Sequence, residues 1–418
     1  MISRRADTLV LGAGLQGTGV ALELARRGLG VTLVDRDACP LNRASLRNEG
    51  KIHLGFIYAN DHSLGTAFLQ LDGALRFRRI LARWIDPEVE WLALSTPFHY
   101  LVAHDSLVAP DRLADHYARV EERYRRQLAK DQDLDYLGAR PENLVRPLAV
   151  GEIAAHFDPA RFAAGFATAE LAIDTDVLAA CLRRAVAESP NITFLPSHVV
   201  RVISEESDGY RIEGDGTEGP WCIWANQVVN ATWERRLALD RQLGIPPPEN
   251  LLHRLKFRVI GRLPVELRGA PSVSMVLGRF GDIVVRRDGT AYLSWYPAGL
   301  RGWSHDIEPP AEWDPACRGE VSPLLSREIA ADILAGIDAW YPGIGRCETL
   351  TVDAGAIVAI GRSDVDDASS ALHDRSRIGV TSRGAYHSVD TGKLTTAPLF
   401  AIEAADRVEA LRLSRRTA

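Results

Sequence analysis

The first 35 residues of the chain contain three hydrophobic segments whose spacing predicts a strand, a helix and a second strand. Thr8–Leu11 is apolar and β-branched, which is typical of a buried strand. Apolar residues then recur from Leu15 to Leu24, and Gly28 follows them as a residue that commonly ends a helix. Val31–Val34 is a second short apolar segment. The pattern therefore predicts a βαβ unit.

Three glycines follow the first strand in the register G-x-G-x-x-G, at Gly12, Gly14 and Gly17. This spacing permits a tight turn, lets the backbone approach a pyrophosphate and directs the helix N-terminus at its charge. Asp35 ends the second strand, 18 residues after Gly17, where a carboxylate can accept hydrogen bonds from both hydroxyls of an adenine ribose. A glycine-rich turn in an ordinary α/β sheet would leave this acid unexplained. The unit predicts a site for FAD or NAD, because the acid favours an unphosphorylated ribose over that of NADP.

Beyond this unit, the hydrophobic pattern first continues with helices and strands and then changes to successive strands. Helical spacing predicts amphipathic helices at 62–85 and 111–130, and short strands are expected at 91–94 and 98–102. Residues 170–230 return to α/β alternation, with a helix capped by Asp174 or Thr175. The strands expected there are 192–195, 199–203, 210–213 and 221–229.

From Pro246 onward, glycine turns separate short strands, a pattern that is typical of an antiparallel sheet. These strands are 251–260, 273–277, 283–287 and 291–296. A helix at 324–340, an apolar segment at 349–360 and a final strand, glycine loop and helix follow. With 418 residues, the chain exceeds one ordinary core, so two domains are expected.

Composition narrows the function classes. A hydrophobic content of 46% and a charged content of 25% are those of a globular protein, and a net charge of −6 gives no reason to expect a nucleic-acid partner. The five cysteines form no C-x-x-C pair, which favours a reducing compartment and predicts no metal site. No apolar run reaches the length of a membrane span, and the chain passes directly into its first strand, so we expect a cytoplasmic protein without a signal peptide.

The motifs together resemble the D-amino-acid-oxidase-like superfamily of FAD-dependent oxidoreductases, over nearly the whole chain. The N-terminal unit matches the FAD fingerprint, and VVNATW is similar to the family's apolar-N-A-T-G, with Trp233 in place of glycine. SLRNEGKIHLGFIY resembles a flavin-contacting loop of the L-2-hydroxyglutarate dehydrogenase and glycerol-3-phosphate dehydrogenase branches, and VDTGKLTT resembles the G-G-K-x-T-T of the latter. Ile357 or Val358 replaces the arginine of their A-G-x-R-P stretch, which argues against a glycerol phosphate substrate.

The resemblance implies an α/β fold with a Rossmann-like FAD-binding domain, similar to that of glutathione reductase, and a second α+β domain with an antiparallel sheet. The expected FAD-binding domain is discontinuous and comprises residues 1–90, 150–235 and 350–418. The expected substrate domain comprises residues 91–149 and 236–349. No second G-x-G-x-x-G is present, so no separate domain for NAD(P)H is expected.

The resemblance also implies which residues hold FAD. For two of these residues, a role without cofactor binding is an open alternative. Arg36 could instead be a solvent-exposed charge that follows a strand, and Val200 could instead be an ordinary core valine. Without the resemblance, the D-T-G-K segment that ends at Lys393 would be a capped helix start with a surface lysine. The expected cofactor-binding residues are Gly12, Gly14, Leu15, Gln16, Gly17, Asp35, Arg36, Ser45, Asn48, Gly50, Lys51, Ile52, His53, Val200, Ala231, Thr232, Val389, Asp390, Thr391, Gly392, Lys393 and Leu394.

Five residues are candidates for catalysis or substrate binding. His53 is a general base for a hydroxyl or amine proton, a covalent attachment point for the flavin, or a structural residue. Lys256 and Arg258 share one face of a strand and could hold a substrate carboxylate, although a solvent-facing surface is the alternative. Tyr386 and His387 precede the C-terminal glycine loop and are candidate substrate contacts.

The sequence thus predicts an FAD-dependent oxidoreductase that takes a hydride from a C–H bond next to a hydroxyl or amine of a small 2-hydroxy acid or amino acid derivative. Electrons would pass to oxygen or a separate carrier. One alternative is an amine or imine-forming oxidase for a larger biosynthetic intermediate. Another is a regulatory or assembly protein that holds FAD without catalysis. Oligomeric state and covalent attachment of the flavin stay open.

Overall fold

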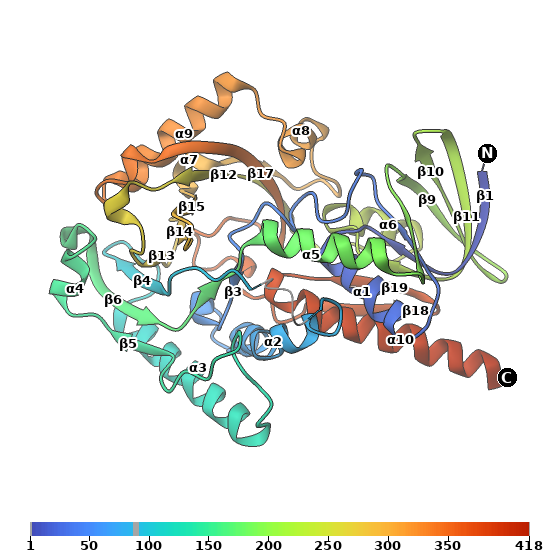
Figure 1. Cartoon of the computed structure of the whole chain (residues 1–418), viewed down its shortest axis with the longest axis horizontal. Helices are drawn as coiled ribbons and strands as arrows, with labels where there is room; N and C mark the ends of the chain where they lie inside the picture. The colour runs from blue at the N-terminus through green and yellow to red at the C-terminus, as the bar shows by residue number, and fades with distance from the viewer. Residues whose placement is uncertain (1, 87–91, 418) are drawn as a thin grey trace.

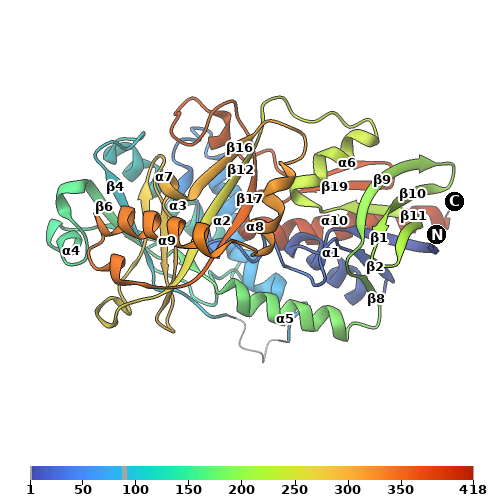
Figure 2. The same ribbon diagram turned by 90° about the horizontal axis from the view of Figure 1, so that it is seen from above.

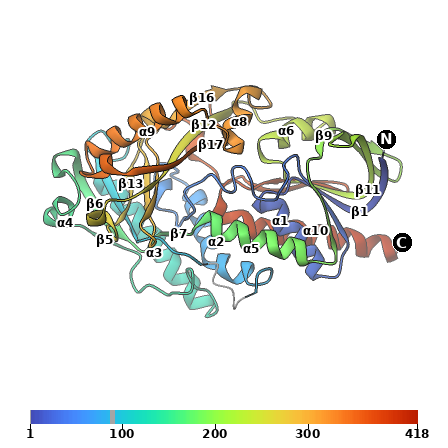
Figure 3. The ribbon, with the colours of Figure 1, turned by 45° about the horizontal axis from the view of Figure 1, so that its top comes forward.

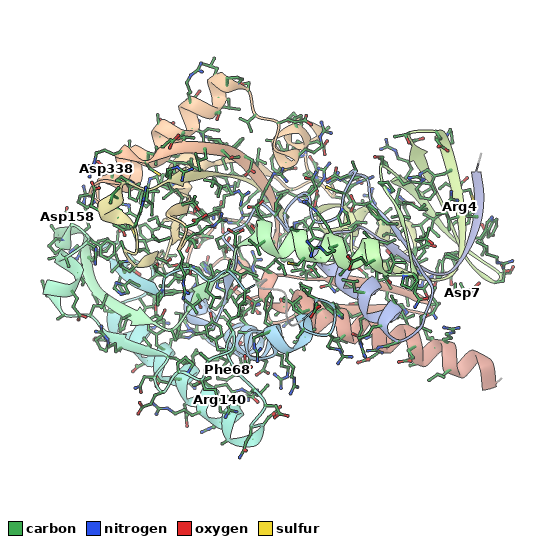
Figure 4. The ribbon with its side chains drawn as sticks, in the orientation of Figure 1. Arg4, Asp7, Phe68, Arg140, Asp158 and Asp338 are labelled. Carbon is green, nitrogen blue, oxygen red and sulfur yellow. The ribbon has the colours of Figure 1, made fainter. Side chains whose placement is uncertain are left out.

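The computed structural model describes residues 2–86 and 92–417 of the chain. The molecule is elongated, with one large sheet near each end (Figure 1). Arg4 and Asp7 mark the end where both termini lie, and Asp158 and Asp338 mark the opposite end (Figure 4). The expected α/β class with two sheets is confirmed.

The first sheet contains the predicted βαβ unit at its centre. Its main path runs β18-β19-β11-β1-β2-β8, and every pair in it is parallel except β18 with β19. An antiparallel ribbon, β9 and β10, extends from β11. The strands are β1 (Ile2–Leu11), β2 (Val31–Val34), β8 (Ile192–Leu195), β9 (Val199–Glu206), β10 (Gly209–Gly216), β11 (Gly219–Asn230), β18 (Gly379–Arg383) and β19 (Tyr386–Asp390).

Helices cover both faces of this sheet because successive strand residues point to opposite sides and both sides are apolar. Val10 of β1 packs in one hydrophobic cluster with the helices on one face, and Leu9 and Leu11 pack in another with α6. The helices of the first face are α1 (Leu15–Arg26), α2 (Gly65–Leu81), α5 (Thr175–Glu188) and α10 (Ala397–Thr417), and α6 is Arg236–Gln242. Asp174 caps α5 by accepting hydrogen bonds from the N–H groups of Asp176 and Val177, as predicted.

The second sheet runs β16-β12-β15-β14-β13-β4-β6-β5, with β17 paired to β12. It is antiparallel apart from the parallel pair of β4 and β13, so the expected antiparallel sheet is in fact mixed. Its strands are β4 (Phe98–Ala103), β5 (Val145–Pro147), β6 (Phe162–Thr168), β12 (Leu251–Arg262), β13 (Ser272–Val276), β14 (Asp282–Val285), β15 (Thr290–Leu293), β16 (Leu300–Ser304) and β17 (Glu348–Ile360).

Helices α9 and α3 lie on opposite faces of the second sheet, and Figure 2 shows α9 from above. In β4, Tyr100 and Val102 face the cluster that includes α3, whereas Leu101 and Ala103 face the cluster that includes α9. The helices of this half are α3 (Pro110–Lys130), α4 (Val150–Ala154), α7 (Tyr296–Gly299), α8 (Asp314–Arg318) and α9 (Pro323–Asp338).

Two findings differ from the expected organisation. The strand expected at 91–94 is not formed: Trp91 lies outside the described residues, and Leu94 makes only an isolated bridge to Ile173. Strands β6 and β17 pair in the second sheet, whereas the expected boundaries assigned their residues, apart from the first two of β17, to the FAD-binding domain. The division of the chain into domains therefore stays a prediction.

A long loop follows β2 and runs along the middle of the molecule between α8 and α5 (Figure 3). It ends in β3 (Lys51–Ile52), which pairs with β7 (Leu171–Ala172) in a small sheet of its own. The loop begins at the carboxyl end of β2 in the first sheet, and its last residues contact the second sheet through the ion pair of Lys51 with Asp282 of β14.

Candidate active site

The turn between β1 and α1 is shaped by its glycines. Gly12 has φ +91°, and a Cβ there would lie 2.7 Å from the carbonyl oxygen of Ala231. A Cβ at Gly17 would lie 1.8 Å from the carbonyl oxygen of Gly12. The first turn of α1 therefore packs directly against the strand ends, and its N-terminus borders a cavity, where the backbone N–H of Leu15 donates to the Ser45 hydroxyl at 2.8 Å.

Asp35 lies at the end of β2 on the wall of the same cavity. Its carboxylate accepts hydrogen bonds from the backbone N–H of Ala13 at 2.5 Å and of Asp37 at 2.8 Å. Burial raises the pKa of Asp35, and these two donors partly counteract that effect. The neighbouring Arg36 also lines the cavity and forms an ion pair with Glu234.

The cavity extends from this turn, past the long loop, to the second sheet. It brings together most of the residues that the sequence singled out, although they come from widely separated segments. Those that line it are Gly12, Gly14, Leu15, Gln16, Asp35, Arg36, Ser45, Asn48, Lys51, His53, Val200, Ala231, Thr232, Lys256, Thr391, Gly392, Lys393 and Leu394.

Four of the expected cofactor-binding residues besides Gly17 do not line the cavity. Gly50, at φ +72°, lies against the carbonyl oxygen of Ile173. The carbonyl of Ile52 accepts a hydrogen bond from Tyr136. Val389 is buried in the core, and Asp390 forms an ion pair with Arg236. Their contacts support the loops that carry the lining residues.

Three of the expected substrate contacts also lie outside the lining of the cavity. Arg258 binds Asp353 through two nitrogens and donates to the carbonyls of Leu46 and Asn48 at 3.0 and 3.3 Å. The sequence pattern could not show that this face of β12 meets the long loop. Arg258 therefore positions that loop.

Tyr386 and His387 support the first sheet. The Tyr386 hydroxyl donates to Asp240 at 2.7 Å and also contacts the amide nitrogen of Asn230. His387 Nδ1 lies 2.8 Å from the hydroxyl of Ser382. Because β19 is an interior strand with both faces covered, these side chains are held in the core, away from the cavity.

At the end of the cavity near the second sheet, Glu49 stands between two sequence-predicted residues. Its Oε1 lies 3.7 Å from Nε2 of His53 and 3.8 Å from Nζ of Lys393. Burial alone would raise the pKa of Glu49, but the Lys393 charge and the His53 contact outweigh it and hold that pKa well below its usual range. Glu49 is therefore an ionised carboxylate.

The basic partners of Glu49 are both less basic than usual. Burial lowers the pKa of His53 more than Glu49 raises it, so the imidazole is neutral at pH 7. Burial also lowers the pKa of Lys393 to about 8, although the negative charge of Glu49 opposes this. His53 Nδ1 has no hydrogen-bond partner among the described residues. A neutral, buried imidazole with a free ring nitrogen can accept a proton.

Two further lysines line this end of the cavity. Lys51 forms an ion pair with Asp282 at 2.7 Å and donates a hydrogen bond to Ser274. Lys256, from β12, places Nζ 4.5 Å from the centre of the Tyr296 ring. The structure thus locates Lys256 at the cavity and separates it from Arg258, two residues further along the strand.

Sequence analysis missed several lining residues. Glu49 lies between Asn48 and Gly50, which were both expected to bind the cofactor. Its position in that loop was the signal that could have identified it as a lining residue. Tyr58 ends the SLRNEGKIHLGFIY stretch, and its place in that motif was likewise the available signal. Asp282 and Arg375 come from separate segments with no motif, so only the folded chain brings them to the cavity.

The cavity fits FAD. Gly12 and Gly17 let the first turn of α1 pack directly against the strand ends, so that the helix N-terminus borders the cavity, and Asp35 presents a carboxylate at the place expected for a ribose. The chain could hold the diphosphate on the first turn of α1 and the flavin between His53 and the loop at 391–394. Within residues 2–86 and 92–417, no cluster of His, Cys, Asp or Glu could bind a metal ion.

Comparisons with known proteins agree with this fit. A family model described as FAD dependent oxidoreductase, DAO, matches residues 7–407. A glycine oxidase from Geobacillus kaustophilus has a TM-score of 0.68 at 18% identity, covering 97% of this chain and 95% of that one. An L-alpha-glycerophosphate oxidase from Mycoplasma pneumoniae, solved with FAD bound, has a TM-score of 0.65 at 16% identity, covering 98% and 95%.

Two more proteins are similar to this chain, one in structure and one in sequence. An L-proline dehydrogenase from P. horikoshii has a TM-score of 0.66 at 15% identity and covers 98% of this chain and 94% of that one. A curated relative, the tRNA 5-methylaminomethyl-2-thiouridine biosynthesis bifunctional protein MnmC from Pseudomonas savastanoi pv. phaseolicola, is 37% identical over 90 residues. That match covers only 22% of this chain and 13% of the relative. None of the described helices is both long enough and apolar enough to cross a membrane.

Proposed function

Because the chain belongs to the DAO family of FAD-dependent oxidoreductases, we propose that its substrate is a small 2-hydroxy acid or amino acid derivative. The proposed reaction removes a hydride from the carbon that carries the hydroxyl or amine. When bound, FAD supplies the acceptor for that hydride. The observation that carries the proposal is a neutral, buried His53 on the wall of a cavity that also presents cationic side chains.

In this proposal His53 accepts the proton of the substrate hydroxyl or amine. Its neutral state at pH 7 leaves a ring nitrogen free for that proton. Glu49 beside Nε2, and Glu170 with Oε1 3.8 Å from Nδ1, would stabilise the imidazolium that forms. The arrangement serves a hydroxyl and an amine equally, so the two substrate types stay alternatives within the proposal.

Arg375 would bind the carboxylate of the substrate. Its guanidinium lines the cavity, and Nη1 donates to the carbonyl of Gly392 at 3.3 Å, which fixes it beside the loop of Lys393. The hydroxyl of Tyr58 is buried on the same wall and has no hydrogen-bond partner among the described residues. An arginine and a tyrosine hydroxyl together can orient one carboxylate.

Lys393 would add a positive charge beside the flavin. Its contact with Glu49 and its place in the lining support this role, which the sequence resemblance first implied. Electrons would leave to oxygen or a separate carrier. The cytoplasmic location and the lack of a nucleic-acid partner are further parts of the proposal and rest on the sequence.

The test is anaerobic addition of 2-hydroxy acids and of matching amino acids to the purified yellow protein. We expect bleaching of the flavin absorbance by members of one set. If no member of either set bleaches the flavin while dithionite does, the proposed substrate class is wrong, and a role that holds FAD without catalysis gains support. Acid precipitation of the same sample separates covalent from non-covalent flavin by the colour of the pellet.

A further inference from the structure

The two ring nitrogens of His53 lie in different surroundings. Nδ1 is buried and has no hydrogen-bond partner within residues 2–86 and 92–417, whereas Nε2 lies 3.7 Å from Oε1 of Glu49, a residue of the cavity lining. Nε2 is therefore the nitrogen that a substrate can reach. If His53 is the base, its lone pair must lie on Nε2, and the single proton of the neutral imidazole must lie on Nδ1.

Glu170 faces the buried nitrogen. Its Oε1 lies 3.8 Å from Nδ1 of His53, and the residue is 0% exposed and lies outside the lining of the cavity. This distance is longer than a hydrogen bond, but such contacts often shorten when a substrate binds. A carboxylate attracts the hydrogen of an N–H bond and repels a lone pair, and both effects are strong where water does not reach. Glu170 thus favours the tautomer of His53 that carries its proton on Nδ1.

Both oxygens of Glu170 are held in place by uncharged donors. The hydroxyl of Tyr100 donates to Oε1, and the backbone N–H of Leu54 donates to Oε2 at 2.7 Å. Burial raises the pKa of Tyr100 well above its usual value, and the charge of Glu170 raises it further, so this hydroxyl stays a donor. Two donors on a buried carboxylate fix its orientation, and Oε1 remains directed at the imidazole.

The hydrogen bond from Leu54 also fixes the backbone at His53. Leu54 is the next residue in the chain, and the N–H of His53 itself donates to Oγ1 of Thr395 at 2.9 Å. The peptide groups on both sides of His53 are therefore anchored, one to Thr395 and one to the carboxylate of Glu170. Glu170 consequently positions the backbone of His53 as well as its ring.

Glu49 presents a second carboxylate, which alone would favour a proton on Nε2. Its Oε1 also lies 3.8 Å from the Lys393 ammonium, which offsets its charge. The charge of Lys51 acts on Glu170, but that ammonium is already paired with Asp282 at 2.7 Å. The negative charge that faces Nδ1 is therefore less compensated than the one that faces Nε2, and it decides the tautomer.

We propose that Glu170 is a positioning residue of the active site: its carboxylate keeps the proton of neutral His53 on Nδ1 and so leaves the lone pair of Nε2 free for the proton of the substrate. This inference rests on the proposed function and deepens it, because it assigns the base to one atom and adds a residue outside the cavity wall. In the transfer, the O–H or N–H bond of the substrate breaks and an Nε2–H bond forms. The imidazolium then directs one N–H bond toward Glu170 and the other toward Glu49.

The direct test is the nitrogen-15 NMR spectrum of the holoenzyme labelled in its histidine rings, recorded at pH 8 and assigned by comparison with His53→Asn. We expect Nδ1 of His53 to give the signal of a protonated ring nitrogen and Nε2 that of a nitrogen with a lone pair. The reverse assignment would overturn the inference, and so would two averaged signals. Because this spectrum uses the unaltered protein, it decides the question even if a variant of Glu170 does not fold.

Glu170→Gln removes the charge and keeps the shape of the side chain. We expect the maximal rate of flavin reduction to fall by about 100-fold or more, because the proton of His53 is no longer held on Nδ1. The affinities for FAD and substrate should stay unchanged, and the NMR spectrum should show the proton moving to Nε2. Glu170→Asp keeps the charge, so the proton should stay on Nδ1. Glu121→Gln on α3, 9% exposed and paired with Arg125, is the control and should behave like the wild type.

The two proposals fail separately. If acids bleach the flavin but Glu170→Gln is reduced as fast as the wild type, only this inference falls. If no acid bleaches the flavin although the proton lies on Nδ1 and leaves it in Glu170→Gln, the proposed reaction falls and the assigned place of the proton stands.

Discussion

Glu49 Oε1 lies 3.7 Å from His53 Nε2, so an ionised carboxylate borders a neutral imidazole inside the cavity. The same oxygen lies 3.8 Å from the Lys393 ammonium. A proton that reaches His53 would create a cation beside an existing anion, which is the favourable direction in a poorly hydrated site. The pair therefore prepares His53 to accept a proton.

Replacing Glu49→Gln should slow flavin reduction by about tenfold to 100-fold, because the amide keeps the shape of the side chain but loses the charge that stabilises the imidazolium. Removal of a negative charge also lowers the pKa of His53, so the acid limb of the rate should move to lower pH. Anaerobic stopped-flow across pH measures both effects. Glu188→Gln, on the exposed end of α5, is the control, and an unchanged rate in Glu49→Gln would contradict the role.

His53→Asn should slow flavin reduction by about 100-fold or more if His53 is the base. In the wild type, burial places the pKa of His53 below its ordinary value of 6.5, so the imidazole stays unprotonated when the pH falls from 8 to 6.5. The rate constant should be level over that range and fall only at lower pH. A rate that already falls between pH 8 and 7 would show that another group controls it.

Lys393 should make the cofactor-free protein more stable as the pH rises from about 8 to 10.5. Burial lowers the folded pKa of Lys393 from 10.5 to about 8, so within this window the unfolded chain binds a proton that the folded chain does not. Unfolding then takes up a proton, and a rise in pH opposes it. Urea unfolding at several pH values, compared with Lys393→Met, isolates this contribution, and equal slopes for both proteins would refute it.

Arg258→Met should weaken FAD binding by about tenfold or more and leave the substrate KM of the reloaded enzyme unchanged. The reason is that Arg258 holds the carbonyls of Leu46 and Asn48 and does not line the cavity. Fluorescence titration of the apoprotein with FAD measures the affinity. Arg262→Met, on the same strand with its side chain 49% exposed, is the control. A raised KM with unchanged FAD affinity would restore Arg258 as a substrate contact.

Gly50→Ala should destabilise the protein by at least about 2 kcal/mol, from the positive φ and the clash together. Gly50 has φ +72°, and a Cβ would lie 2.1 Å from the carbonyl oxygen of Ile173. That backbone cannot move freely, because the N–H of Ile173 donates to the carbonyl of Gly50 at 2.9 Å. Chemical denaturation measures the loss. Gly30→Ala, with open space around its Cβ position, should be nearly neutral, and equal stabilities of the two variants would contradict the account.

The first half of the nucleotide site could be predicted because its signals are local. Gly12, Gly14 and Gly17 and the acid at Asp35 all fall within one βαβ unit, where hydrogen bonds between neighbouring elements determine the geometry. Asp174 and α5 are similarly local. For such segments, the spacing of residues in the sequence already specifies their spacing in space.

The reactive end of the cavity depends on contacts that no local pattern contains. Lys256 and Arg258 lie on the same strand and are both cationic, yet Lys256 lines the cavity and Arg258 binds the long loop. Arg375 has no motif around it and lies in an irregular segment before β18, so only the folded chain places it in the lining with Tyr58. The sequence could therefore predict cofactor-binding segments better than substrate-binding side chains.

The make-up of the FAD cavity also determines when it can be completed while the chain is synthesised from its N-terminus. Residues around Gly12 form one side of the cavity, Ala231 closes the turn, and Thr391–Leu394 complete the far end, so nearly the whole polypeptide must be present before all three meet. The complete cavity for FAD can therefore form only after nearly the whole polypeptide has been synthesised. A nascent chain interrupted before β19 would lack that far end, however well its opening βαβ unit had formed.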